Sequence, residues 1–339
     1  MLVEEVAGVP ASGPRPRDRR GRRGRRGRRW PARLAVAVAV PFAAGTAVRL
    51  GGLESGPLLV PLVSFTPYFA TAALLALAVA GLARSRAAVA VMLAVCACLA
   101  WCVVPRAVAD GEPAPGRPLR LLTANLNGGR GDAATVVGLV RGLGVDVLSL
   151  QELTYAERDR LRAAGLEELL PYQVTRPETW GPVGSGLYAR YRLRERTGLF
   201  RPVGHHMPVA EVALPGGRPV EVVVVHPVAP VPSTVSEWHD GVATLPPAPA
   251  SGPARILAGD FNATLDHAVL RGLLDTGYTD AAAATGQGLV PTWPMRRFPP
   301  LVAIDHVLTD GRAGAVAVRI HDVPGSDHRA LFADLRVRP

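Results

Sequence analysis

The sequence predicts a globular domain of the α/β or α+β class, preceded by membrane-spanning helices, and two observations support this prediction. Three apolar runs occupy most of residues 34–104, and each is about the length of a bilayer crossing. After residue 118 the pattern changes to short β-rich runs, separated by helical stretches and by loops rich in proline and glycine. The final segment of about 220 residues is long enough to bury a core of its own.

Residues 1–33 form an arginine-rich tail that we expect to be disordered and cytoplasmic. The tail holds 11 arginines against three acidic residues, whereas residues 111–339 hold 23 arginines and 23 acidic residues. The net charge of +10 therefore belongs mainly to the tail, and the globular domain is neutral. Because a nuclease that binds duplexes usually carries positive charge on its folded domain, nucleic acid is the less favoured partner.

The three apolar runs predict three transmembrane helices within residues 34–109. The runs are Leu34–Val48, Leu58–Ala83 and Ala87–Val104, and the second is interrupted by Pro61 and Pro67. A soluble helical bundle is the alternative, but it would show charged faces at helical spacing, and these runs show none.

The arginine bias predicts the orientation. The tail and the Arg84-Ser85-Arg86 connection should both stay inside, so three crossings place the domain outside the cell, after a linker at residues 110–118. The protein is then a multi-pass plasma-membrane protein with a cytoplasmic N-terminus and an extracytoplasmic domain. Ala107-Val108-Ala109 is similar to a signal-peptide cleavage site, although an alanine-rich chain also produces such a match by chance. Cleavage after Ala109 stays open.

The domain should contain at least six strands and two helices. The expected strands are Leu119–Ala124, Val145–Leu150, Val220–Val225, Arg255–Ala258, Val302–Leu308 and Ala330–Val337, and the expected helices are Ala133–Leu143 and Tyr155–Ala164. The last strand follows a charged pair, Asp327-His328, directly. Buried strands seldom begin in this way, so the pair is a candidate for a functional site.

Polar side chains suited to metal or phosphate chemistry end or interrupt six of these apolar runs. They are Asn125 and Asn127, Gln151 and Glu152, His226, Asp260 and Asn262, Asp305 and His306, and Asp327 and His328. One such residue alone is more often a helix cap, a turn residue or a structural histidine. Six groups within one domain point to a shared site.

This ordered set resembles the endonuclease/exonuclease/phosphatase superfamily, which includes DNase I-like nucleases, sphingomyelinases and inositol phosphatases. The resemblance spans about residues 119–335, and its most specific part is the sequence GDFN at Gly259–Asn262, followed by IDHVL and SDH. The stretches GSGLYARYRL and PTWP also match. The resemblance implies a four-layer α/β sandwich, in which two packed mixed β-sheets are flanked by helices and the strand ends converge at one edge.

The resemblance also implies a divalent metal, Mg²⁺ or Mn²⁺, because a hard cation with oxygen ligands offsets the charge of a phosphoester and polarises its P–O bond. Glu152 is the expected ligand, with Asn125 beside it and Asp327 supporting the metal directly or through water. Many relatives carry an acid at the position of Asn127, so whether one or two ions bind stays open.

The remaining residues receive roles in catalysis through the same resemblance. His328 is the candidate general base, because imidazole titrates near neutral pH, and Asp305 would hold and polarise it. Asp260 would orient the attacking water, while His226 and Asn262 would donate hydrogen bonds to the phosphoryl oxygens.

Five other histidines are not assigned a role in catalysis. His205 and His206 precede an expected strand and are predicted to lie in a loop. Trp238-His239 is placed on a helix that could border the cleft, and His306 and His321 have no partner that the sequence identifies.

Three spans in front of such a domain resemble bacterial membrane members of the superfamily, including the VanJ type linked to teicoplanin resistance. This implies a phosphoesterase whose substrate is a lipid-linked phosphate or pyrophosphate at the outer leaflet, with membrane lipids as partners. A surface nuclease is the enzymatic alternative. A catalytically silent membrane protein with a binding or regulatory role is the other, and the oligomeric state stays open.

Overall fold

The computed structural model describes residues 29–111, 115–295 and 300–338. Most of the predicted arginine-rich tail, residues 1–28, lies outside the described residues, as does the centre of the predicted linker. Helix α2 (Arg29–Gly51) already includes the last residues that the sequence assigned to the tail.

The apolar segment contains two helices that are long and apolar enough to cross a membrane, or three spans if a bent pair counts as one. The two are α2 and the helix that starts with α5 (Arg86–Val103). The middle apolar run is not one straight helix. It forms α3 (Gly56–Val63) and α4 (Thr66–Leu82), which meet at an angle of 77°.

Prolines explain the break in the middle run. Pro61 lies inside α3, and Pro67 occupies the first turn of α4, where its missing N–H is tolerated. Since neither residue can donate a helical hydrogen bond, a continuous helix through Ser64 and Phe65 is disfavoured.

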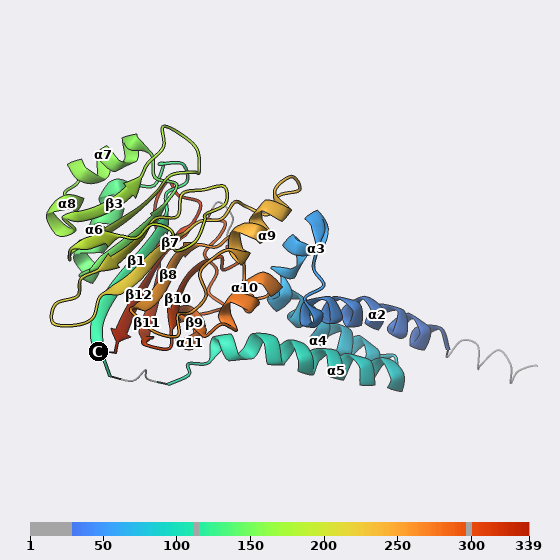
Figure 1. Ribbon diagram of the computed structural model, residues 1–339. Coiled ribbons are helices and arrows are strands. Elements are labelled where there is room, and N and C mark those ends of the chain that lie inside the picture. The colour runs from blue at the N-terminus through green and yellow to red at the C-terminus, as the bar shows by residue number, and fades with distance from the viewer. Residues whose placement is uncertain (1–28, 112–114, 296–299, 339) are drawn as a thin grey trace, which may run out of the picture.

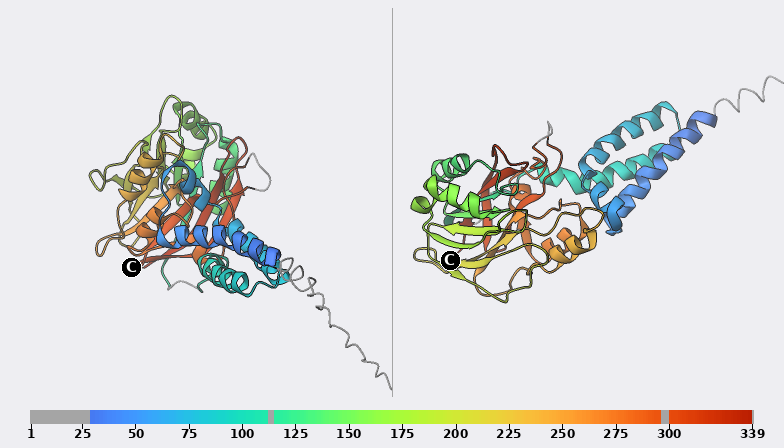
Figure 2. Two further views of the ribbon diagram at one scale, coloured as in Figure 1. Left: turned by 90° about the vertical axis from the view of Figure 1, so that its right-hand side faces the viewer. Right: turned by 90° about the horizontal axis from the view of Figure 1, so that it is seen from above.

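The helices pack as an antiparallel group that projects away from the domain (Figures 1 and 2). Small residues bring the start of α2, the end of α4 and the start of α5 together at the far end: Ala35, Ala80 and Ala88. The other ends of α2 and α5, together with α3, lie against the domain. The start of α2 and the domain are therefore at opposite ends of the helical group.

The domain is built from two six-stranded sheets. The first has the order β11-β12-β1-β2-β4-β3. Its strands are β1 (Arg117–Asn125), β2 (Val147–Gln151), β3 (Tyr172–Arg176), β4 (Ser185–Ala189), β11 (Ala313–Asp322) and β12 (Arg329–Val337). Helices cover its outer face: α6 (Ala133–Leu143), α7 (Tyr155–Ala163) and α8 (Leu166–Leu169).

The second sheet has the order β5-β6-β7-β8-β10-β9. Its strands are β5 (Leu193–Glu195), β6 (Val209–Val212), β7 (Val220–Val225), β8 (Ala254–Asp260), β9 (Tyr278–Asp280) and β10 (Asp305–Asp310). Helices α9 (Val235–Ala243) and α10 (Ala268–Leu274) cover its outer face. Two short elements, η1 (Val104–Ala107) and α11 (Ala281–Ala284), lie where the helical group joins the domain.

The main core lies between the two sheets, where apolar side chains of β1, β7 and β8 such as Leu121, Val222 and Ile256 are fully buried. Two further clusters fill the spaces between each sheet and its helices. Helices, sheet, sheet and helices thus form four layers, and the predicted α/β sandwich is confirmed (Figure 1). The layers form because each sheet has two apolar faces to cover.

Strand direction explains why the polar groups meet at one edge. Strands β1 and β2 are parallel, as are β7 and β8, so their carboxyl ends point the same way. Strands β10 and β12 run antiparallel to β8 and β1, so their amino ends lie at that same edge. Asp305, which starts β10, and His328, which precedes β12, therefore lie at the same edge as the polar residues at the ends of the other four strands.

The strand predicted over Val302–Leu308 begins later, at Asp305. Val302 pairs with Trp293 in an isolated bridge, and its N–H donates to the Trp293 carbonyl at 2.9 Å. The pairing of β10 with β8 starts only at Asp305. A local apolar pattern cannot distinguish these two partners, because both pairings bury Val302.

Candidate active site

Asn125 links the ends of both sheets. Its side-chain amide donates to Glu152 Oε1 at 3.1 Å and to Asp260 Oδ2 at 3.0 Å, while its Oδ1 accepts from the backbone N–H of Asn127 at 2.8 Å. Glu152, directly after β2, has a φ of 58°, in the left-handed region that non-glycine residues rarely adopt. The two carboxylates therefore lie on either side of one amide, and the backbone of Glu152 is turned to bring its side chain there.

Asp260 ends β8 at the centre of the site and is fully buried. Its Oδ1 accepts from the backbone N–H of Asn262 at 2.8 Å, and Asn262 has a φ of 49°. The preceding residue must be glycine, because a Cβ on Gly259 would lie 1.9 Å from the carbonyl oxygen of Val225. This close approach of β7 and β8 explains the first letter of the GDFN motif.

His328 and Asp305 form a buried pair between the two sheets. His328 Nδ1 lies 3.0 Å from Asp305 Oδ2, and its Nε2 lies 3.6 Å from Asp260 Oδ2. Ser326 holds the turn that carries the histidine: its hydroxyl donates to the Asn125 carbonyl at 2.7 Å and accepts from the His328 N–H at 3.0 Å. The Asp-His pairing is the one that the sequence predicted, and it leaves Nε2 facing the centre of the site.

Burial and neighbouring charges shift the pKa of both groups. Burial raises the pKa of Asp260 above its usual range, and the nearby Asp305 carboxylate adds to this. Burial alone would lower the pKa of His328, but the carboxylates of Asp305 and Asp260 outweigh it, so the pKa of His328 is raised. The raised pKa favours the imidazolium form of His328 over the neutral imidazole.

His226 follows β7 and is also buried. Its Nε2 lies 3.9 Å from Glu152 Oε1 and 3.8 Å from Asp260 Oδ2. Its pKa is held well below the usual range by burial, then by His205 and His328, so it is neutral. Its Nδ1 is buried without a hydrogen-bond partner among the described residues. A neutral imidazole with a free nitrogen can donate one hydrogen bond to an anionic ligand.

Three residues that the sequence did not assign also lie here. His205 was placed in a loop and is there, but its ring lies against His226, with centroids 4.4 Å apart. Thr292 Oγ1 accepts from the N–H groups of Ile304 and Asp305, which fixes the start of β10. Trp293 donates from Nε1 to Asp327 Oδ2 at 3.4 Å, and its ring centroid lies 6.4 Å from that of His328. Only the PTWP match pointed to two of them.

The other sequence candidates have structural partners. His306 is buried and lies 2.9 Å from both Asp280 Oδ2 and the Ala263 carbonyl. Burial lowers its pKa, but these acceptors outweigh that effect and raise it. Trp238 is buried under the loop after β8 and donates to the Phe261 carbonyl at 3.4 Å, so it does not border the cleft. The side chain of Asn127 contacts Arg130.

The donor set fits a hard divalent cation. Asp260, Asp305 and His328 each offer one ligand atom within 4.8 Å of one another, and Glu152 adds a carboxylate beside the same Asn125 amide. Asp305 Oδ1 is buried without a hydrogen-bond partner among the described residues. Several carboxylate oxygens close together match the oxygen ligands that Mg²⁺ or Mn²⁺ prefers.

Metal binding should release protons. A cation beside Asp260 opposes the causes that raise the pKa of Asp260 and of His328, so at pH 7 we expect about one proton to leave per ion bound. Calorimetric titration with Mn²⁺ in two buffers of different ionisation enthalpy measures that number. Equal heats in both buffers would contradict this expectation.

Comparison with known proteins agrees with this geometry. Residues 122–328 match the model of the Endonuclease/Exonuclease/phosphatase family. The protein described as endonuclease/exonuclease/phosphatase from Beutenbergia cavernae DSM 12333 has a similar fold, at 17% identity and a TM-score of 0.52, over 66% of this chain and 72% of that chain. D. rerio TDP2, complexed with a single strand DNA product, is 16% identical, with a TM-score of 0.52, over 65% and 99% of the two chains. No curated protein matches the sequence significantly. The match of 122–328, the four-layer sandwich and the converging strand ends together assign this chain to the endonuclease/exonuclease/phosphatase family.

Proposed function

We propose that the protein is a membrane-anchored, divalent-metal-dependent phosphoesterase that hydrolyses a lipid-linked phosphoester or pyrophosphate outside the cell. The observation that supports the reaction class best is the joining of the His328–Asp305 pair to the carboxylates of Asp260 and Glu152 at one sheet edge. A base and an oxygen-rich cation site within a few ångströms of each other suit in-line attack of water on phosphorus.

In this proposal His328 takes the proton from water. Asp305 accepts from Nδ1–H, which fixes the tautomer with Nε2 free and stabilises the imidazolium that forms. Asp260, 3.6 Å from Nε2, orients the water. His226 and the amide of Asn262 would donate hydrogen bonds to the phosphoryl oxygens. The Asn262 amide also donates to the Pro227 carbonyl at 3.1 Å.

Glu152 would hold the metal, with Asn125 beside it and Asp327 in support. When bound, the divalent ion offsets the negative charge of the phosphoryl group and polarises the P–O bond. The hydrogen bond from Trp293 Nε1 to Asp327 Oδ2, at 3.4 Å, places that carboxylate beside the Trp293 ring.

The neutral charge of the domain favours a substrate that the membrane delivers. With 23 arginines and 23 acidic residues after residue 110, the domain has no net field to draw a polyanion from solution. Helices that can span a bilayer would instead hold the site near lipid head groups, where local substrate concentration is high. Phospholipid or polyprenyl phosphates are the substrates that this arrangement suits.

A nuclease is the second candidate, because the TDP2 relative is described with a DNA product. The two candidates differ in their response to salt, since nucleic-acid binding rests on neutralised phosphates and weakens steeply as salt rises. A silent binding protein is less favoured, because the Asp-His pair and both carboxylates of the site are in place.

The substrate test uses the full-length protein in liposomes. We expect undecaprenyl pyrophosphate or a phospholipid phosphoester to be hydrolysed at least tenfold faster than plasmid DNA or RNA, with Mg²⁺ or Mn²⁺, and with little effect of modest salt changes. Initial rates on each substrate at two salt concentrations decide the matter. Faster DNA cleavage with a steep salt dependence would replace the lipid-phosphatase proposal with the nuclease.

For the orientation, we propose a cytoplasmic N-terminus and an extracytoplasmic domain. In support, the start of α2 and the Arg84-Ser85-Arg86 turn gather at the end of the helical group that is far from the domain. Positive residues favour the cytoplasmic side. Alkaline phosphatase fused after Asp110 should be active and a fusion after Arg84 inactive; the reverse pattern would invert the topology.

A further inference from the structure

A buried ion cluster is one of the contacts between the apolar helices and the domain. Arg49, near the end of α2, and Arg106, in η1 after α5, both pair with Asp266. Arg49 Nε lies 2.7 Å from Asp266 Oδ1, and Arg106 binds both carboxylate oxygens, at 2.8 and 2.6 Å. The side chains of the arginines are 10% and 9% exposed and that of Asp266 is 1% exposed. A bidentate contact at such burial fixes position as well as charge.

Asp266 belongs to the loop that carries the candidate catalytic groups. The loop after β8, residues 261–267, begins directly after Asp260, includes Asn262 and ends at α10. The loop is internally stiff: the Thr264 N–H donates to His267 Nδ1 at 2.9 Å, and the Thr264 hydroxyl accepts from the Asp266 N–H at 3.4 Å. These bonds tie Asp266 to Thr264, which is two residues from Asn262 in the same loop and four from Asp260.

The same loop is held from α3 and from the domain. His267 accepts at Nδ1, so its Nε2 carries the hydrogen that is donated to the Val60 carbonyl of α3 at 3.0 Å. On the domain side, His306 binds the Ala263 carbonyl, and Trp238 binds the Phe261 carbonyl. Phe261 and Ala263 are thus held by the domain, and His267 is held by the apolar helix α3. His267 and its partner Val60 are 207 residues apart in sequence.

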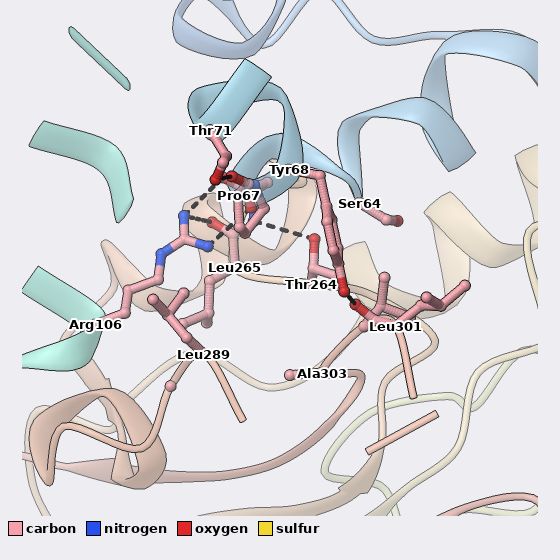
Figure 3. A pocket seen from close by; sticks show the side chains of 13 residues that line it. Ser64, Pro67, Tyr68, Thr71, Arg106, Thr264, Leu265, Leu289, Leu301 and Ala303 are labelled. Carbon is pink, nitrogen blue, oxygen red and sulfur yellow. Dashed lines mark hydrogen bonds and ion pairs between the residues drawn. The ribbon is translucent and has the colours of Figure 1, made fainter. Parts of the chain in front are cut away.

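A second contact leads from α4 to the other half of the site. The Tyr68 hydroxyl donates to the Leu301 carbonyl at 2.8 Å, and the Leu301 N–H donates to the Trp293 carbonyl at 2.9 Å. Trp293 in turn binds Asp327, the neighbour of His328. Tyr68 and Leu301 line a cavity of about 250 Å³ together with Arg106 and Leu265. Figure 3 shows Tyr68 and Leu301 on one side of this cavity and Arg106 and Leu265 on the other.

We infer that the membrane segment is part of the active-site support: Asp266, clamped by Arg49 and Arg106, is a positioning residue that sets the place of Asp260 and Asn262. This role rests on the proposed phosphoesterase function. It goes beyond anchoring, because the helices reach the two ends of the site separately, through residues 261–267 and through Trp293. Small displacements matter here, since a shift of about 1 Å in a reacting group can cost about 100-fold in rate.

The test is Asp266→Glu in the full-length protein in detergent or liposomes. This change keeps the negative charge and both arginine partners but lengthens the side chain by one methylene, so the loop must move. We expect kcat to fall about 10- to 100-fold while KM stays within about threefold, because binding groups outside the loop are untouched. Tyr68→Phe, which removes one hydroxyl from the second contact, should lower kcat about two- to tenfold in the same manner.

Asp159→Glu is the matched control, because Asp159 pairs with Arg158 at 3.1 Å on an exposed face of α7. It should leave kcat and KM unchanged. Hydrogen–deuterium exchange gives a readout that does not depend on turnover: Asp266→Glu should speed exchange in peptides covering residues 259–267 at least about tenfold and leave those at the end of β2 unchanged. Wild-type kcat in Asp266→Glu, or unchanged exchange in this loop, would overturn the inference. A wild-type protein that turns over no phosphoester, but whose loop loosens in Asp266→Glu, would instead contradict the proposed function alone.

Discussion

Replacing His328 with alanine is expected to lower kcat by about 10²–10⁴-fold, the contribution typical of a general base. His328 Nδ1 lies 3.0 Å from Asp305, which holds the ring, and Nε2 lies 3.6 Å from Asp260 and faces the centre of the site. The measurement is the rate on the best substrate at saturating metal, with thermal unfolding followed in parallel.

His321→Ala is the control for this change. His321 lies on β11, in the same sheet, and contacts none of the site residues. It should retain wild-type kcat. Near-normal turnover in His328→Ala at saturating metal would show that the water is activated in some other way, for example by the cation alone.

Asp260→Asn should lower kcat by about 10²–10³-fold, with the overall fold retained, because the side chain keeps its size. The change removes one of the three carboxylates that raise the pKa of His328, the others being Asp305 and Asp327, so that pKa should fall. The neutral form of His328 is the base in the proposed mechanism, so the residual activity should extend to lower pH than in the wild type. The pH dependence of kcat for both proteins measures this shift.

Asp240→Asn serves as the matched control for the second change. Asp240 lies on α9, and its side chain is 70% exposed, so neither kcat nor its pH dependence should change. If Asp260→Asn retained its rate but required far more metal, Asp260 would act as a metal ligand and would not orient the water.

Local sequence identified six of the twelve strands that the structure describes, together with the polar residues at their ends. Strand β7 and helix α6 have the predicted bounds. Consecutive valines at Val222–Val225 favour a buried strand, and Asp132 caps the helix that Gly144 ends. The polar residues after or before six strands were identified by the same local rule. The pairing of His328 with Asp305 came from the resemblance, and the structure places the two side chains together.

Only the tertiary structure decided how these groups meet. The packing of two sheets brings Asn125 of the first against Asp260 of the second, a contact between residues 135 positions apart that no local pattern encodes. The ring of His205 lies against that of His226 because β6, which follows His205, pairs antiparallel with β7, which His226 follows.

The junction with the apolar helices was likewise beyond the sequence. The sequence pattern places Arg49 and Arg106 near the ends of apolar runs and Asp266 in a loop. It does not reveal that they pair, because local periodicity depends only on neighbours along the chain. Their partners lie 217 and 160 residues away. The sequence by itself determined the apolar character of the helical segment, six of the strands and the polar residues at their ends. The folding of the helices onto the domain decided which charges became buried and paired, because a buried charge is tolerated only where its partner is brought to it.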